Sequence, residues 1–333
     1  MRHRMEEKSN PKFLLLRKRQ EIISTIRKDL YSQNFLEVET PLLVKHTTPD
    51  VHLDSILADN GYLITSTEYQ VKRLIASGFP QVFTLTKNFR AHDKGRYHSP
   101  EFTMLEWGRA FQTLHDIEED AVRFIQKAFR KLYPNQNYLT FNGNTIDFMT
   151  NSWERLTVRQ AFEDYLGLKN LGNFSLENIR KASKEADIDL PKDYEDDLPF
   201  TISFLLDKLQ TYLGKEKPTF LHEWPSFLTS SAPSNAKDPY TVERSELYIG
   251  GIEIANGFPF LRDPKIQKKL FEEQLDQRKL LGKPSVTLDD KYIEALSQLP
   301  EGAGMALGVD RLVMILTESS SLSDVQAFDW DDL

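Results

Sequence analysis

The feature that most constrains the fold is a pair of strand-like runs, QVFTLTKNFR and EFTMLEW, which are joined by a polar segment. Side chains alternate across a strand, so the second run places Phe102, Met104 and Glu106 on one face. On that face an aromatic ring could stack on a purine and a carboxylate could hold an ammonium group. Arg90 ends the first run, and its planar guanidinium suits carboxylate or phosphate oxygens. The alternative is an ordinary amphipathic strand that follows a solvated hairpin tip.

The composition indicates a globular protein and excludes several classes of function. With 333 residues, 40% of them hydrophobic, the chain can bury a sizeable core. Its net charge of -8 provides no chain-wide basic field for nucleic acid. The absence of cysteine excludes disulfides, cysteine nucleophiles and thiolate metal sites, and it suits a reducing cytoplasm. No apolar run approaches the roughly 20 residues of a membrane span, and the charged start does not resemble a signal peptide, so we expect a soluble cytoplasmic protein without a membrane partner.

Helical and strand-like patterns alternate along the chain in an α+β order. Apolar residues recur at helical spacing from Lys12 to about Ser32 and from about Leu114 to Leu132. The region from about 151 to 215 is also helical but is broken by polar links such as PKDYEDDLP, and we interpret it as a helical insertion. The other predicted elements are a short strand stopped at Pro41, strands around Tyr62–Ser66 and Gln81–Thr86, a helix capped by Ser66 and Thr67 that ends near Gly78, strands at KPTFLHEW, and a helix over Pro264–Leu281.

A hairpin is predicted at SELYIGGIEIAN, because two apolar runs flank a two-residue glycine loop. If Ile249 pairs with Ile252, Tyr248 faces Glu253 and Glu246 faces Ala255, all on one side of the ribbon. The two glutamates then become diagonal neighbours, roughly 7–8 Å apart at the backbone. Two converging carboxylates completed by substrate phosphates are typical of a magnesium site. The alternative places both glutamates in solvent on an edge hairpin.

The segment GMALGVDRLVMIL is predicted to form a strand followed by a helix. Gly304, Ala306 and Gly308 leave room for a ligand to approach the backbone. Arg311, near the start of the helix, could clamp the terminal phosphates of ATP and stabilise the charge of the departing pyrophosphate.

Together, these segments resemble the catalytic core of class II aminoacyl-tRNA synthetases, specifically the lysyl branch. NFRAHDKGRYHSPEFTMLEW is similar to the second motif of that class, GMALGVDRLVMIL to the third, and FLEVETPLL to the first motif, which forms the dimer. The resemblance covers nearly the whole chain. It implies one catalytic domain over residues 1–333, a six-stranded antiparallel sheet flanked by helices, and a homodimer. Because the first-motif helix begins about ten residues from the start, we expect no anticodon-binding domain and no anticodon recognition.

Within the lysyl branch, GKEKPTF, GIEIANGF and ALGVDR resemble segments of truncated paralogues that attach (R)-β-lysine to a lysine of elongation factor P. Those paralogues have alanine, as at Ala306, where lysyl-tRNA synthetases have glycine. The resemblance implies that ATP activates the amino acid as an aminoacyl-adenylate, which an acceptor amine then attacks. No side-chain nucleophile is required. Catalysis would come from positioning and from charge neutralisation by Arg90, Arg311 and Mg²⁺.

The resemblance also implies roles for individual residues, carried over position by position. Arg90 and Arg311 are the catalytic residues, and Glu246 and Glu253 hold the magnesium ion. The residues implied in amino-acid binding are Ser66, Thr67, Glu68, Glu106, Gly108, Asn256, Phe260 and Ala306. The residues implied in ATP binding are Arg90, His92, Ser99, Phe102, Glu253, Ile254, Gly308 and Arg311.

Three positions depart from the family pattern. His92 stands where the second motif has a glutamate that holds the nucleotide, and Gly108 replaces a tyrosine that touches substrate. Phe260 replaces a glutamate that neutralises the far ammonium of lysine. Burying an ammonium against phenylalanine without that carboxylate costs several kcal/mol. The pocket is therefore predicted to be more apolar, and to suit a less charged amino acid than lysine or β-lysine, although Glu106 retains part of the interaction.

Two other functions remain open at this stage. The activated amino acid could pass to a small molecule instead of to a protein such as elongation factor P. Alternatively, the chain could be an idle amino-acid or nucleotide sensor in which His92 and Phe260 mark decay. Retention of Arg90, both metal carboxylates and Arg311 argues against decay. His98 and His222 are interpreted as structural, because adenylation needs no general base.

Overall fold

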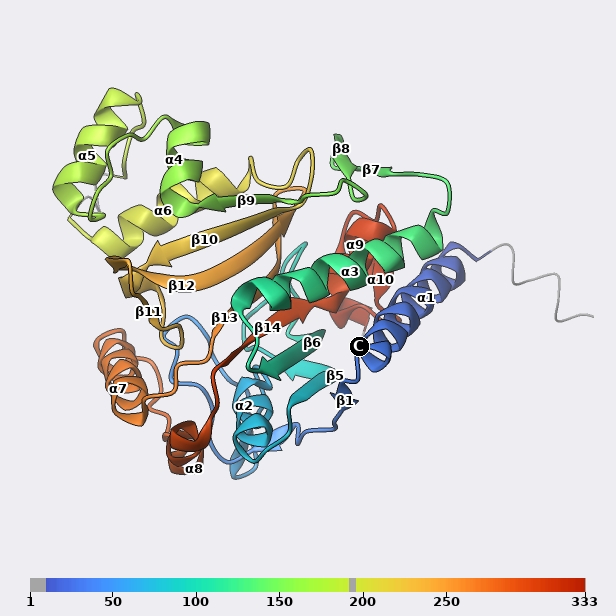
Figure 1. Ribbon diagram of the computed structural model, residues 1–333, viewed down its shortest axis with the longest axis horizontal. Coiled ribbons are helices and arrows are strands. Elements are labelled where there is room, and N and C mark those ends of the chain that lie inside the picture. The colour runs from blue at the N-terminus through green and yellow to red at the C-terminus, as the bar shows by residue number, and fades with distance from the viewer. Residues whose placement is uncertain (1–9, 192–195, 333) are drawn as a thin grey trace, which may run out of the picture.

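The computed structural model describes residues 10–191 and 196–332, and a nine-stranded sheet organises this part of the chain (Figure 1). The sheet has the strand order β1-β5-β6-β14-β13-β12-β10-β9, and β11 pairs with β12 beside this path. Its strands are β1 (Leu36–Glu37), β5 (Gln81–Phe89), β6 (Glu101–Ala110), β9 (Glu154–Thr157), β10 (Thr219–Pro225), β11 (Ser234–Asn235), β12 (Asp238–Ile249), β13 (Ile252–Pro259) and β14 (Gly302–Gly308).

The six strands from β5 to β10 along this order pair antiparallel throughout, as the sequence resemblance implied. A parallel strand is added at each side, β1 against β5 and β9 against β10. The strand at β9 was not predicted, because it lies within the segment interpreted as helical. Two smaller sheets lie beside the large one. They comprise β2 (Leu43–Val44), β3 (Leu57–Ala58) and β4 (Gly61–Leu63), and the hairpin of β7 (Tyr138–Phe141) and β8 (Asn144–Asp147).

The long predicted helices form close to their predicted bounds. Asn10 caps the first helix through its side chain, and a capping box of Thr113 and Asp116 starts the third. The α-helices are α1 (Pro11–Ser32), α2 (Glu68–Ala76), α3 (Leu114–Leu132), α4 (Val158–Leu166), α5 (Leu176–Glu185), α6 (Leu198–Gln210), α7 (Pro264–Leu280), α8 (Asp290–Ala295), α9 (Val309–Leu316) and α10 (Leu322–Val325).

One face of the sheet is closed by helices. In Figure 1, α3 crosses this face with α1 beside it, and their contact is held by Asp29, which pairs with Arg123 at 2.9 Å and Lys127 at 2.6 Å. Trp107 of β6 is fully buried here and meets the Phe124 ring of α3 edge-on at 5.2 Å. Since side chains alternate along β6, Phe102, Met104 and Glu106 are directed to the opposite face of the sheet, as predicted. That face holds the candidate site.

The predicted insertion is only partly helical, since β9 joins it to the edge of the main sheet. Its helices α4, α5 and α6 bury an apolar cluster that also includes Leu221 and Val242 of the main sheet. The helical insertion therefore shares its core with the sheet. The single catalytic domain over residues 1–333 stays a prediction. The polar link PKDYEDDLP falls partly on residues 192–195, and most of the charged start lies in residues 1–9. Both stretches are outside the described residues.

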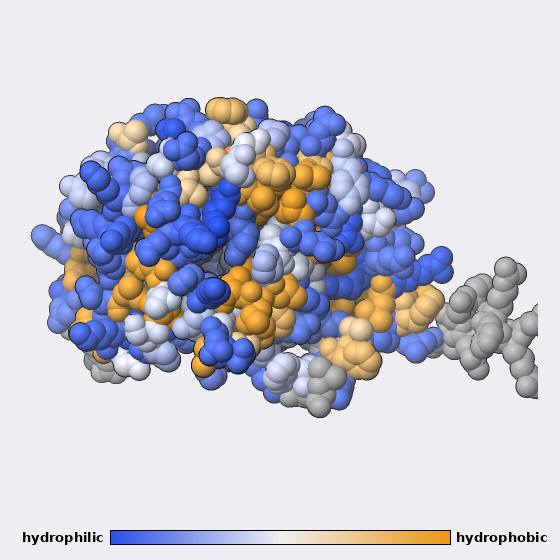
Figure 2. Space-filling model, turned by 90° about the horizontal axis from the view of Figure 1, so that it is seen from below, coloured by the Kyte–Doolittle hydropathy of each residue, from blue (hydrophilic) through white to orange (hydrophobic). Residues whose placement is uncertain are grey.

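Within residues 10–191 and 196–332, no helix is both long enough and apolar enough to cross a membrane. Figure 2 shows the molecule from below, where hydrophobic side chains form separate groups between hydrophilic ones.

Candidate active site

A cavity of about 560 Å³ opens on the face of the sheet opposite α3. Its walls come from α2, from strands β6, β13 and β14, and from two loops around residues 46–54 and 228–231. A volume of this size is ordinary for a site that holds a small-molecule ligand. The predicted residues that line it are Ser66, Glu68, Arg90, Ser99, Phe102, Glu106, Glu246, Glu253, Ile254, Asn256, Phe260, Ala306, Gly308 and Arg311.

The β12–β13 hairpin has the predicted glycine turn but a different register. Ile249 pairs with Ile252 and Tyr248 with Glu253, as expected. The register then shifts between Leu247 and Tyr248, so Glu246 pairs with Asn256 instead of with Ala255. A bulge of this kind adds a residue to one strand and re-aims the side chains beyond it. The predicted pairing of Glu246 was therefore wrong by one position, and the bulge aligns Asn256 with Glu246 on the face that lines the cavity.

Glu246 is a buried carboxylate with partners of its own. Tyr248 donates its hydroxyl hydrogen to Glu246 at 2.6 Å, and the Arg244 guanidinium forms an ion pair with it. Burial raises the pKa of Glu246 to about 7, with a further contribution from nearby Glu253 and against the effect of Arg244. The Glu253 side chain is 40% exposed, which leaves its carboxylate accessible from the cleft.

These carboxylates fit a magnesium ion held jointly by the protein and by phosphates. A divalent cation would offset the repulsion between Glu246 and Glu253 that contributes to the raised pKa. Among the described residues, no group of three or more potential metal-ligating side chains gathers. A donor set of two carboxylates agrees with the usual coordination of Mg²⁺, which keeps water or phosphate oxygens as its other ligands.

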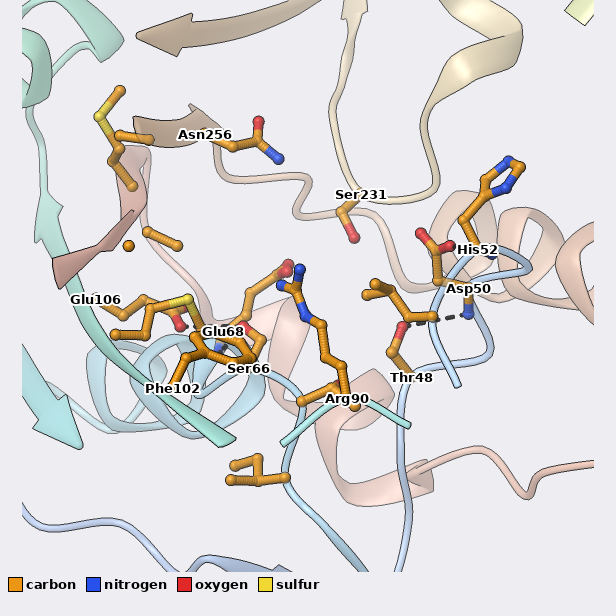
Figure 3. A pocket seen from close by; sticks show the side chains of 18 of the residues that line it. Thr48, Asp50, His52, Ser66, Glu68, Arg90, Phe102, Glu106, Ser231 and Asn256 are labelled. Carbon is orange, nitrogen blue, oxygen red and sulfur yellow. Dashed lines mark hydrogen bonds between the residues drawn. The ribbon is translucent and has the colours of Figure 1, made fainter. Parts of the chain in front are cut away.

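Arg90 is the buried cation at the centre of the cleft. Figure 3 shows its side chain extending between Glu68 and Asp50. The guanidinium lies 5.1 Å from the centre of the Phe102 ring, and Nε has no hydrogen-bond partner among the described residues. Burial lowers the pKa of Arg90, because removing the charged guanidinium from water is unfavourable. A buried arginine that lines a cleft is suited to an anionic ligand.

Arg311 reaches the same cleft from the start of α9. Its Nε donates to the Tyr97 carbonyl at 3.1 Å, and Nη1 donates to the Glu253 carbonyl at 2.9 Å. Nη2 lies 2.8 Å from Nε2 of His98. Burial and the charge of Arg311 lower the pKa of His98, which favours the neutral ring that can accept this hydrogen bond. His98 thus lines the cavity and contacts Arg311, while its interpretation as a structural residue stays a prediction.

Glu106 receives three hydrogen bonds at one carboxylate oxygen. The Ser66 hydroxyl donates at 3.0 Å, and both the backbone N–H and the hydroxyl of Thr67 donate at 2.9 Å. Thr67 is the N-cap residue of α2, as predicted, but its hydroxyl donates to Glu106 and makes no capping hydrogen bond. Burial and the neighbouring Glu68 nevertheless raise the pKa of Glu106 to about 7.

A lysine that the sequence analysis did not identify also lines this end of the cleft. Lys72 is 3% exposed, and its Nζ forms an ion pair of 2.6 Å with Glu68, one helical turn earlier in α2. The ammonium also lies 5.0 Å from the ring centre of Phe258 and 6.0 Å from that of Phe260. The spacing of Glu68 and Lys72 along the helix was visible in the sequence, but it is equally typical of a solvated surface pair.

Three predicted residues do not line the cavity. Thr67 is fully buried and acts through Glu106. Gly108 lies under the site, where Ile75, Val71 and Phe260 would meet any added side chain. His92 adopts a left-handed backbone conformation with φ of 65° in the turn after β5, while its neighbours Ala91 and Asp93 line the cavity. The structure therefore places His92 outside the cavity lining, and its predicted nucleotide contact stays a prediction.

Comparison with known proteins agrees with this geometry. The family described as tRNA synthetases class II (D, K and N) matches residues 2–331. Proteins from Salmonella gallinarum and Salmonella paratyphi B, both named elongation factor P--(R)-beta-lysine ligase, are each 34% identical over 328 residues. The matched region covers 95% of this chain and 95% of each relative.

Proposed function

The chain belongs to the class II tRNA synthetase family, and we propose that it is an ATP-dependent ligase that activates an amino acid and transfers it to a protein lysine. Elongation factor P is the candidate acceptor, because the similar Salmonella proteins are named as ligases acting on it. The observation that carries the proposal is the buried Arg90, which lines a cleft that also contains Arg311 and two carboxylates.

The proposed reaction begins with the amino-acid carboxylate held at Arg90. One carboxylate oxygen attacks the α-phosphorus of ATP, so an O–P bond forms while the bond to pyrophosphate breaks. Arg90 would neutralise charge at the α-phosphate, and Arg311 would neutralise charge on the departing pyrophosphate. Because the attacking group belongs to the substrate, the protein contributes position and charge rather than a nucleophile.

The remaining residues of the cleft support the two substrates. The second face of the Phe102 ring, away from Arg90, suits a stacked purine, while Ser99, Ile254 and Gly308 border the same region. Glu246 and Glu253 would hold Mg²⁺, which supplies further charge neutralisation at the phosphates. The acceptor lysine then attacks the carbonyl of the aminoacyl-adenylate as a free amine, and AMP leaves.

The oligomeric state and the relation to transfer RNA are proposed from the same family resemblance. We expect a homodimer formed through the first-motif region and no recognition of an anticodon. Size-exclusion chromatography with light scattering tests the dimer. Incubating the protein with ATP, amino acids and transfer RNA tests the second expectation, since no aminoacylated RNA should form.

Two assays test the proposed function. Amino-acid-dependent exchange of labelled pyrophosphate into ATP should occur in the native protein and should be lost in Arg90→Ala. Intact-mass spectrometry of elongation factor P should then show one added aminoacyl group, located on a lysine. AMP release only with small amines would indicate a small-molecule acceptor. Nucleotide binding without any exchange, for every amino acid tested, would contradict the ligase and favour a sensor.

A further inference from the structure

We propose that the amino acid activated in this cleft has an uncharged side chain, and that Phe260 sets this specificity. The inference rests on the proposed function and deepens it, because it names the class of amino acid that the same cleft accepts. Two observations support it. The first is the packing of Phe260, and the second is the number of charges at the amino-acid end of the cleft, which is formed by Glu68, Lys72, Glu106 and Phe260.

The Phe260 ring packs against glycines of two neighbouring strands, β6 and β14. A Cβ added at Gly108, Gly302 or Gly304 would come within 3.3, 2.7 or 3.3 Å of the Phe260 ring. The ring is 6% exposed and belongs to a core cluster with Val71 and others from α2 and α8. It therefore lies flat against the strands and forms a fixed apolar wall of the cavity.

The glycine at position 108 is required for this arrangement. Its missing side chain leaves space that Phe260, Val71 and Ile75 fill together. A larger residue at 108 would displace the Phe260 ring. The two departures from the family pattern thus form a single packing unit, which removes polar atoms from this wall of the site.

The charged groups at this end nearly balance before any substrate binds. Glu68 already has a cationic partner in Lys72, at 2.6 Å. Among the described residues, the hydrogen-bond donors to Glu106 are the neutral groups of Ser66 and Thr67. When Glu106 is ionised, Glu68, Lys72 and Glu106 together carry one negative charge beyond the Glu68–Lys72 pair, which the single amino group of an amino acid neutralises.

A charged side chain would disturb this balance in either direction. A second ammonium would bring an unpaired positive charge close to Lys72 and against the Phe258 and Phe260 rings. A side-chain carboxylate would meet Glu68 and Glu106, while Lys72 is already paired with Glu68. Burying an unpaired charge is strongly unfavourable, so an uncharged side chain is favoured over both.

Binding of adenylate analogues tests this inference directly. Sulfamoyl-adenosine derivatives of L-lysine, (R)-β-lysine and L-2-aminoheptanoate would be titrated by calorimetry against the native protein. The last compound carries a methyl group where lysine carries its ammonium, so shape is matched and charge is not. We expect the uncharged analogue to bind about tenfold tighter or more. Equal or tighter binding of either lysine compound would overturn the inference.

A matched pair of variants tests the effect of a carboxylate charge at position 260. Phe260→Glu should improve binding of the lysyl analogue relative to the uncharged one by about tenfold, whereas Phe260→Gln, of the same size, should not. Thermal melting establishes that both variants fold, and the comparison in the native protein stands without them. An equal gain in both variants would show that space rather than charge sets the preference, and would contradict the inference.

Failure of the inference is distinguishable from failure of the proposed function. Pyrophosphate exchange that is fastest with lysine would retain the ligase and overturn the inference. Tighter binding of the uncharged analogue without exchange for any amino acid would overturn the ligase and retain the preference of the cleft. If none of the analogues binds, both are overturned.

Discussion

The two ends of the cleft treat their charges differently. At the nucleotide end, Nε of Arg90 has no hydrogen-bond partner among the described residues, and the Glu253 side chain is 40% exposed. At the amino-acid end, Lys72 and Glu68 neutralise each other, and the Phe260 ring packs against the glycines of β6 and β14. The nucleotide end is therefore arranged to interact with a highly charged ligand, whereas the amino-acid end already satisfies most of its own charges. We therefore expect chemistry and substrate choice to depend on separate groups of residues.

Removing Arg90 should have the largest effect and should act at the nucleotide end. We expect Arg90→Ala to lower the rate of pyrophosphate exchange by about a thousandfold or more, because charge developing in the transition state loses its buried partner. Arg90→Lys keeps the charge but not the planar fork, and should recover only part of the rate. Steady-state exchange measures both variants. A rate within about tenfold of native in Arg90→Ala would contradict the assigned role.

Removing Lys72 should mainly affect stability. Lys72→Met leaves Glu68 without its cation beside Glu106, and we expect a loss of about 2 kcal/mol in the free energy of unfolding, which urea denaturation measures. Lys269 provides a matched control, since its pair with Glu273 has the same helical spacing but is 77% and 53% exposed. Lys269→Met should change stability by less than about 0.5 kcal/mol. Similar losses of unfolding free energy in the two variants would contradict the proposal that Lys72 neutralises Glu68 at the amino-acid end.

The pH dependence of KM for the amino acid should report the ionisation of Glu106. Because burial raises the pKa of Glu106 to about 7, this group is largely protonated at pH 6 and ionised at pH 8. Only the ionised form attracts the amino group of the substrate, so KM for the amino acid should fall about tenfold over this range. Glu106→Gln should abolish this change. A profile that is unaltered in the variant would contradict the role of Glu106.

The same shift has a consequence for stability. The pKa of Glu106 is higher in the folded protein than its ordinary value of 4.5. As pH rises from about 4.5 to 7, the unfolded chain releases this proton first, so the free energy of unfolding falls over that interval. Denaturation of Glu106→Gln across the interval should show a smaller fall than in the native protein.

The smallest effect is expected at His92, which lies outside the cavity lining. Asparagine tolerates its left-handed backbone conformation better than alanine does, so His92→Asn tests the side chain without adding strain. We expect KM for ATP to change by less than about twofold. A change of tenfold or more would show that His92 does contact the nucleotide.

Much of the fold was predictable because local patterns specify it. Amphipathic spacing gave the bounds of α1, α3 and α7 closely, and alternation gave the correct faces of β6. The sequence did not reveal the bulge that pairs Glu246 with Asn256, since an extra residue in one strand leaves the apolar alternation on either side intact. The edge strand β9 was missed because its four residues lie next to a strong helical pattern.

Prediction of the site had a similar limit. Residues with a family role, such as Arg90 and Glu246, could be transferred by position, and they do line the cavity. Lys72 and His98 were not assigned to the site because their importance depends on contacts between distant segments, with Phe258 and with Arg311. For Phe260 the substitution was evident in the sequence, but its packing against the glycines of β6 and β14 became visible only in the structure.

The most direct test is pyrophosphate exchange across a panel of amino acids, with Arg90→Ala as the inactive control. The panel pairs lysine and (R)-β-lysine with uncharged amino acids of similar length. We predict exchange that depends on Arg90 and is fastest with an uncharged amino acid. Exchange that is fastest with lysine or (R)-β-lysine would contradict the proposed separation of chemistry from substrate choice.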